Sequence, residues 1–146
     1  MVQAFADAGV TQVFHKVRLK PGKPVYFGRR DVDGATVTRV LGLPGNPVSA
    51  FVTFHLFAAP LLARLAGRDL PAWQEVALAQ RVQRGGQRTA LLRARMVDGR
   101  ALPFHDQSSG ALHDLVAADV LLRMDHASYD AGARVPALRL TSHVLE

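Results

Sequence analysis

The stretch Gly42-Leu43-Pro44-Gly45-Asn46-Pro47-Val48-Ser49-Ala50 decides how this chain folds, because it lies between two segments with different periodicity. Before it, Val37–Leu41 is rich in β-branched residues and predicts a strand. Within it, Asn46 is suited to cap a helix, and Pro47 to occupy the first helical position. After it, Val48–Leu65 is apolar on more than one side, which is typical of a helix buried between layers. The stretch therefore predicts a strand, a tight turn and a buried helix in succession.

The flanking segments extend this pattern in both directions. Met1–Ala8 has apolar residues at helical spacing, and Thr11–Val17 alternates in the manner of a strand. Val25–Gly28 predicts a further strand ahead of the turn. Downstream, Pro60 is expected to kink the helix and Gly67 to end it. The first half of the chain is therefore expected to be an α/β unit.

The second half changes character after a short linker. We predict strands at Trp73–Ala79, Thr89–Val97, Val120–Met124 and Arg134–Leu140, with one helix at Gly110–Ala118. Pro136 interrupts the last strand, which suggests an edge position for it. The predicted organisation is an α/β domain at 1–67, a linker at 68–72 and a small β-barrel-like domain at 73–146.

All three lysines of the chain, Lys16, Lys20 and Lys23, fall within Phe14–Pro24, although fourteen of the fifteen arginines lie elsewhere. Several cations on one strand face repel one another unless an anion neutralises them. The nearby turn at 42–50 presents the N-terminus of a helix, where anions bind well. The two features together predict a site for an oxyanion or a phosphorylated ligand. The alternative is a solvated edge strand that carries protective charges.

Composition narrows the remaining classes of protein. The 146 residues are 49% hydrophobic with a net charge of +6, so a packed core is expected. The arginines form no stripe with interleaved aromatic residues, which argues against nucleic acid as a partner. No cysteine is present, and no apolar run reaches the roughly 20 residues needed to span a bilayer. The start of the chain lacks the features of a signal peptide, so a cytoplasmic protein without membrane contact is expected.

The histidines do not suggest a metal site. None of the six has a common zinc-binding spacing, so no metal ligands are predicted in this chain. His105, Asp106 and Ser109 lie close together, but the serine lacks the context of a nucleophile elbow. A hydrolase triad is therefore not expected.

The two N-terminal motifs in order, Phe14–Pro24 and Gly42–Ala50, resemble a known family. They are similar to the C-terminal half of molybdopterin molybdenumtransferases, the MoeA and gephyrin E-domain family, whose pattern is near K-V-x-x-K-P-G-K-P followed by G-L-P-G-N-P-V-S-A. Residues Gln107–Gly110, Leu115–Met124 and Ala131–Val135 resemble the family's small C-terminal β domain. The resemblance implies part of a three-layer, MogA-like α/β domain with a largely parallel sheet, followed by a small, mostly β domain.

The resemblance also implies an activity. Members of the family insert molybdate into adenylated molybdopterin and release AMP, using a divalent cation such as Mg²⁺. It implies Lys16 and Lys20 as catalytic residues. It implies an anion or molybdopterin site at Lys23, Pro44, Gly45, Asn46, Pro47 and Ser109. The Mg²⁺ ligands of the family lie upstream of the matching region, and a homodimer is implied for the parent protein.

The chain alone is expected to be inactive, because the upstream groups that bind nucleotide and metal have no counterpart in it. Two further interpretations of the function stay open. A non-catalytic protein-interaction module derived from the same family is the main alternative. A nucleotide-amide hydrolase that shares the α/β domain is disfavoured, because Val48-Ser49-Ala50 follows Pro47 where that family has an acidic residue.

Overall fold

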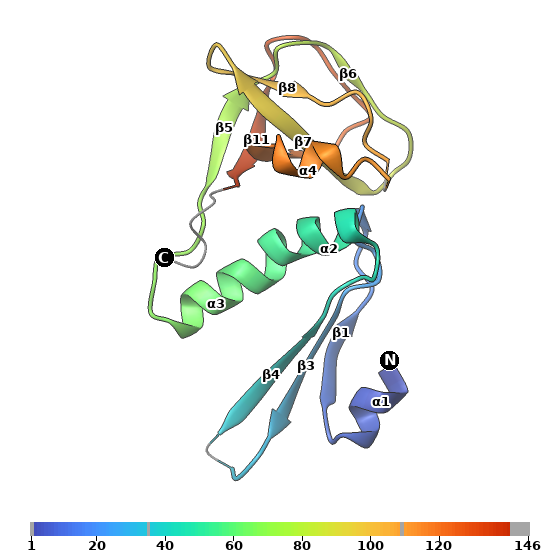
Figure 1. Cartoon of the computed structure of the whole chain (residues 1–146), viewed down its shortest axis with the longest axis vertical. Coiled ribbons are helices and arrows are strands. Elements are labelled where there is room, and N and C mark those ends of the chain that lie inside the picture. Colours follow the sequence, from blue (N-terminus) through green and yellow to red (C-terminus); the bar gives the residue numbers. More distant parts are fainter. Residues whose placement is uncertain (1, 35, 109, 141–146) are drawn as a thin grey trace.

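The computed structural model describes residues 2–34, 36–108 and 110–140. Figure 1 shows the sheet of the first half at one end, a β-rich half at the other and a long helix between them. The first half contains α1 (Val2–Asp7), β1 (Thr11–His15), β2 (Leu19–Lys20), β3 (Tyr26–Asp31) and β4 (Val37–Gly42). Strands β1, β3 and β4 form one antiparallel sheet in that order. The strands of this sheet pair antiparallel, where the resemblance implied a largely parallel sheet.

Aromatic residues pack helices onto both faces of this sheet. Neighbouring residues of a strand point to opposite faces, so Tyr26 and Phe27 face different layers. Tyr26 is 1% exposed and its ring lies 4.7 Å from that of Phe5 in α1. On the other face, the Phe14 ring lies 5.7 Å from Phe27 and 6.1 Å from Phe57 of the long helix. The layered α/β architecture predicted for the first half is confirmed.

The long helix is continuous but changes its winding. It consists of α2 (Pro47–Thr53), a π-helical turn η1 (Phe54–Ala58) and α3 (Ala59–Leu65). Pro60 lacks the N–H that a regular helix requires. The wide turn lies immediately before it, and the N–H of Ala59 donates to the carbonyl of Phe54, five residues back. The distortion expected at Pro60 therefore takes the form of a π-bulge.

The helix ends at Gly67, as predicted. Gly67 has φ +69°. Its N–H donates to the carbonyl of Arg64 at 3.3 Å, and the N–H of Arg68 donates to the carbonyl of Ala63 at 2.8 Å. These two bonds form a Schellman motif, which requires a left-handed residue at this position.

The helix comes nearer to the length of a membrane span than the sequence reading suggested. Pro47–Leu65 spans 19 residues with a mean hydropathy of 1.6, so its length and composition match a candidate membrane span. Of its most apolar window, 22% is buried. A single helix of this kind is weak evidence, since the core helix of a packed protein has the same character. Val48 and Val52 are in fact fully buried within the protein.

The second half is built of short strands around a small core. Its elements are β5 (Trp73–Ala77), β6 (Val82–Gln83), β7 (Thr89–Val97), β8 (Arg100–Pro103), α4 (His113–Val116), β9 (Val120–Met124), β10 (Ser128–Tyr129) and β11 (Arg134–Arg139). The main sheet has the order β2-β7-β9-β11-β5, with β8 beside β7, and β6 pairs with β10. An α/β part followed by a β-rich part is the predicted fold class, which is confirmed.

Two local predictions in this half are wrong. Pro136 does not mark an edge, because β11 lies between β9 and β5. Its pairing with β9 begins only at Ala137, so the ladder on that side starts after the proline. The helix expected over Gly110–Ala118 is reduced to the four residues of α4.

The two halves are joined by a strand pairing and a common core. Leu19 and Lys20 of β2 pair in parallel with Thr89 and Ala90 of β7. Beneath this pairing lies a cluster that we call the shared core, made of Leu19, Val52, Leu91, Leu121 and Leu138. It draws residues from both halves, whereas Ala90, Leu122 and Met124 belong to a second cluster within the β-rich half. Neighbouring residues of β7, such as Ala90 and Leu91, therefore pack into different hydrophobic clusters on opposite faces of the strand.

Substitution of Gly67 by alanine tests the helix end. A β-carbon there would meet nothing within 4 Å, so the cost comes from the left-handed backbone alone. We expect Gly67→Ala to lower the free energy of unfolding by about 1 kcal/mol, measured by urea denaturation. Gly85→Ala is the matched control, because Gly85 also faces open space but has no positive φ. An equal loss in both variants would contradict the explanation.

Candidate functional site

The lysine segment is a closed loop and not the continuation of a strand. Strand β1 ends at His15, and Lys16 adopts φ +68°, so the prediction of a strand reaching Val17 is wrong at its last two residues. The N–H of Lys16 donates to the carbonyl of Val25 at 3.0 Å, and the N–H of Val17 to the carbonyl of Lys23 at 2.9 Å. The backbone thus holds Lys16 and Lys23 at the base of one loop.

Burial along this loop still alternates as the sequence predicts. Lys16, Arg18 and Lys20 are exposed, whereas Leu19 is buried and Val17 is half-buried. Both apolar side chains pack into the shared core. The cations are therefore held at the surface by the burial of the residues between them.

The turn after Lys20 presses against the start of the long helix. Gly22 has φ +107°, and a β-carbon on it would overlap the methyl group of Thr53. The same position lies 3.9 Å from the carbonyl oxygen of Ser49, which accepts a 2.7 Å hydrogen bond from the Thr53 hydroxyl. The two sequence motifs are thus in contact, and only glycine fits between them.

The helix start has the predicted cap but fewer amides than the motif suggests. The Asn46 side chain accepts a hydrogen bond from the N–H of Ser49 at 3.1 Å. Pro47 has no N–H at all. Pro44 is buried, whereas Gly45, Asn46 and Pro47 are exposed. The cap is confirmed, but it occupies one amide and the proline removes another, so an anion finds few donors here.

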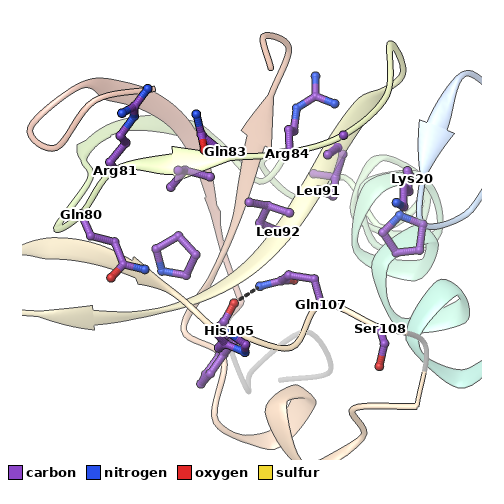
Figure 2. A pocket seen from close by; sticks show the side chains of 16 residues that line it. Lys20, Gln80, Arg81, Gln83, Arg84, Leu91, Leu92, His105, Gln107 and Ser108 are labelled. Atoms are coloured by element: carbon purple, nitrogen blue, oxygen red, sulfur yellow. Dashed lines mark hydrogen bonds between the residues drawn. The ribbon is translucent and has the colours of Figure 1, made fainter. Parts of the chain in front are cut away.

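A cavity of about 660 Å³ lies where Lys20 meets the β-rich half. Figure 2 shows Lys20 at one end, Arg81 and Gln80 at the other, and Leu91 and Leu92 between them. We call it the Lys20 cavity. Of the predicted site residues, Lys20 is the one among its described lining. The predicted Ser109 lies outside the described residues, while its neighbour Ser108 lines the cavity.

The predicted residues are therefore only partly brought together. Lys16, Lys23 and the turn at 44–47 lie on the loop and helix start that adjoin Lys20, but they do not line the cavity. The part of the chain that the structure describes places no carboxylate in the lining. Arg81 pairs with the Asp130 carboxylate at 3.8 Å, outside the described lining, so the positive charge that favours an anionic ligand comes mainly from Lys20 and Arg84.

Arg88 is a residue that the sequence reasoning missed. It directly precedes β7, and its guanidinium donates to the carbonyl of Leu19 at 3.3 Å. Arg84 donates to the carbonyl of Arg88 at 2.7 Å and to that of His126 at 2.8 Å. Arg88 thus lies beside the Lys20 strand. Only the pairing of β2 with β7 brings Arg88 to this place, and these two strands lie far apart in the sequence.

Arg93 and Gln107 were also missed, and they hold the segment that carries Ser108. Arg93 is 1% exposed, and its burial lowers the pKa of the guanidinium. The guanidinium donates to the carbonyls of Asp106 at 2.9 Å and Ser108 at 3.3 Å. The Ser108 N–H donates to the Asp106 carboxylate at 2.7 Å, and hydrogen bonding to Ser108 lowers the pKa of that carboxyl.

The described residues do not fit a Mg²⁺ site. Across 2–34, 36–108 and 110–140, no group of three or more His, Asp or Glu side chains could hold a metal ion. Mg²⁺ prefers several oxygen ligands in octahedral geometry. No step of the chemistry is therefore derived from a metal bound by these residues.

The left-handed backbone of Lys16 gives a direct test of the loop geometry. Glycine normally destabilises a protein relative to alanine, but at φ +68° we expect the order to reverse by about 1 kcal/mol. Lys16→Gly should therefore unfold at higher urea concentration than Lys16→Ala, although both remove the same charge. At Arg18, where φ is not positive, the alanine variant should be the more stable one. Equal stability of the two Lys16 variants would refute the geometry.

Sequence comparisons agree with this architecture. Residues 1–64 match a family described as a probable molybdopterin binding domain, and residues 75–140 match the MoeA C-terminal region, domain IV. A Synechocystis protein named molybdopterin molybdenumtransferase is 32% identical over 144 residues, covering 92% of this chain and 33% of that protein. A Synechococcus elongatus protein of the same name is 38% identical over 117 residues, covering 77% of this chain and 27% of that protein.

Solved structures support the same relationship. A molybdenum cofactor biosynthesis protein from Pyrococcus furiosus superposes with a TM-score of 0.73 at 28% identity, over 90% of this chain and 46% of that chain. The chain spans a third or less of the length of the Synechocystis and Synechococcus elongatus relatives. Together the two family matches cover most of the chain, so it belongs to the MoeA family and corresponds to the C-terminal portion of its members.

Proposed function

We propose that the lysine loop and the Lys20 cavity form part of the site that binds molybdate and adenylated molybdopterin for molybdenum cofactor biosynthesis. One observation carries this proposal. The pairing of β2 with β7 places Lys20 next to Arg88, at the end of a cavity whose described lining holds cations and no carboxylate. Molybdate is a dianion and the adenylated pterin contains a pyrophosphate, so both suit such a site.

The residues have different roles in this proposal. Lys16 and Lys20 act as the catalytic cations that neutralise the anions during transfer, and Lys23 adds charge from the base of the same loop. Pro44, Gly45, Asn46 and Pro47 form the turn that supports the loop. Ser109 is proposed as a hydroxyl donor from the β-rich half. Water around a compact ammonium group weakens its attraction for an anion. Partial burial of the ligand excludes some of that water and so strengthens the attraction.

The complete reaction needs more than this chain supplies. Insertion of molybdate with release of AMP, the use of Mg²⁺, a homodimeric parent and a cytoplasmic location remain proposals. The domain boundaries at 1–67, 68–72 and 73–146 are likewise proposed. The metal and nucleotide groups would come from the upstream part of the parent protein.

Molybdate binding by the chain tests the site. We expect Lys20→Ala to weaken molybdate binding about tenfold, because a charge within a few ångströms is lost. Equilibrium dialysis with labelled molybdate at low salt measures this. Arg95→Ala is the control, since Arg95 is an exposed cation of β7 outside the lining. An equal loss for both variants would show a general charge effect and contradict a site at Lys20.

The chain by itself should release no AMP from adenylated molybdopterin and molybdate. The described residues include no group of side chains that could hold a metal ion, and the reaction is expected to need such an ion. Quantification of AMP by liquid chromatography measures this, with a full-length family member as the positive control. Measurable AMP from the pure chain would contradict the division of roles. Failure to bind molybdate, combined with capture of a stoichiometric protein partner, would favour the interaction-module interpretation.

A further inference from the structure

Strand β7 has a gap along one edge, and a side chain fills it. Its first residues pair with β2, and its last residues, from Ala94 onward, pair with β8. Between them, the backbone of Arg93 pairs with the amide of Gln107. The N–H of Arg93 donates to Oε1 at 3.0 Å, and Nε2 donates back to the carbonyl of Arg93 at 2.9 Å. The Arg93 carbonyl also accepts from the Phe104 N–H at 3.1 Å, so Gln107 supplements one backbone bond at the carbonyl and supplies the acceptor that a neighbouring strand would offer to the Arg93 N–H.

The same two residues are connected a second time through the side chain of Arg93. Its buried guanidinium donates to the carbonyls on either side of Gln107, those of Asp106 and Ser108. Gln107 also donates to the carbonyl of Phe104 at 2.9 Å. The segment 104–108 is therefore fixed to β7 by backbone and side chain together.

The contacts of Arg93 leave little freedom for the segment to move. Nε of Arg93 is buried and has no hydrogen-bond partner among the described residues. A buried cation is costly unless its donors are satisfied. Displacement of the segment would remove the Asp106 and Ser108 carbonyls and leave more of the guanidinium unpaired. The conformation of the segment and the burial of Arg93 thus depend on each other.

This segment forms one wall of the Lys20 cavity. Phe104, His105, Gln107 and Ser108 all line it. Figure 2 shows Gln107 between His105 and Ser108, with Arg84 across the cavity and Lys20 at its end. The distance from this wall to Lys20 sets the space open to a ligand.

We propose that Gln107 is a positioning residue, which holds the 104–108 wall against β7 so that the cavity fits an oxyanion beside Lys20. This inference rests on the proposed function. Gln107 need not touch the ligand, because it acts through the backbone of Phe104, Asp106 and Ser108. A glutamate would keep the acceptor for the Arg93 N–H but lose both donors at neutral pH.

The first test uses Gln107→Met, which keeps the length of the side chain and removes the amide. We expect molybdate affinity to fall about tenfold, as for other residues that orient a ligand shell. Hydrogen exchange should accelerate at the Arg93 and Ser108 amides, which report the wall directly. Gln74→Met is the matched control, because Gln74 is an exposed glutamine of β5 in the same half and does not belong to the described lining of the cavity. Gly67→Ala serves as a destabilised variant remote from the cavity and should bind molybdate as the unchanged chain does.

A pH profile separates positioning from general stability. For Gln107→Glu, protonation restores one donor, so its affinity relative to the unchanged chain should rise from about pH 7 to about pH 5. Gln83→Glu, which places the same charge in the cavity without these bonds, should show a smaller rise. Molybdate protonation affects all variants alike and cancels in the ratio.

The outcomes distinguish the two proposals. Unchanged affinity of Gln107→Met in a folded protein with faster exchange at Arg93 would overturn the positioning role and leave the anion site intact. Absence of molybdate binding by the unchanged chain would overturn the proposed function, and the positioning role with it. Both proposals are supported if Gln107→Met binds molybdate more weakly and exchanges faster at the Arg93 amide, while the two control variants bind as the unchanged chain does.

Discussion

The burial of Leu19 is the constraint on which the rest of the structure depends. Leu19 is 8% exposed and contacts side chains from both halves in the shared core. The pairing of β2 with β7 spans only two residues on each strand, and so short a parallel pairing is weak in isolation. Burial of Leu19 stabilises it, and the adjacent Lys20 is placed at the surface as a result. The position of the cation therefore follows from the hydrophobicity of its neighbour.

Two arginines at or beside the Lys20 cavity have neutral hydrogen-bond partners. Arg84 and Arg88 donate to backbone carbonyls, which are neutral and orient a guanidinium without cancelling its field. Arg123 differs, because it donates to the Asp125 carboxylate at 2.8 Å. Oriented cations with neutral partners are suited to act on a bound anion, whereas an ion pair is already compensated. Arg81 lines the cavity but pairs with Asp130 at 3.8 Å, so Arg84 is the lining arginine whose charge is the less compensated.

Features set by local chemistry could be predicted from the sequence. Asn46 caps the helix, Gly67 ends it, and Thr89–Val97 forms a strand with the predicted bounds, because each depends on neighbours within a few residues. The left-handed Lys16 could not be predicted, since lysine has no preference for that conformation. Only the hydrogen bonds that close its loop require it.

The remaining surprises are non-local. The pairing of Lys20 with Ala90 joins segments that are distant in the chain, and only this pairing brings Arg88 to the site. The bonds between Gln107 and Arg93 depend on a gap between two strands, one of them the short β8 that no local pattern indicated. Pro136 lies in a central strand because its ladder with β9 starts one residue later. Such features follow from the register in which two strands pair. Register depends on both strands, so the sequence of one segment does not determine it.

The helix start illustrates how a motif can support a ligand without binding it. Asn46 occupies the Ser49 amide and Pro47 has none, so the turn itself has little capacity to donate to an anion. Its rigidity instead fixes the first turns of the helix, where Thr53 and the Ser49 carbonyl lie against Gly22. Gly22 in turn follows Lys20 and Pro21, so the direction of that loop is set by the helix on one side and by β7 on the other. In the proposed site, the charge that would act on a ligand comes from the lysine loop and the arginines, while the proline-rich turn helps to determine where the lysine loop is held.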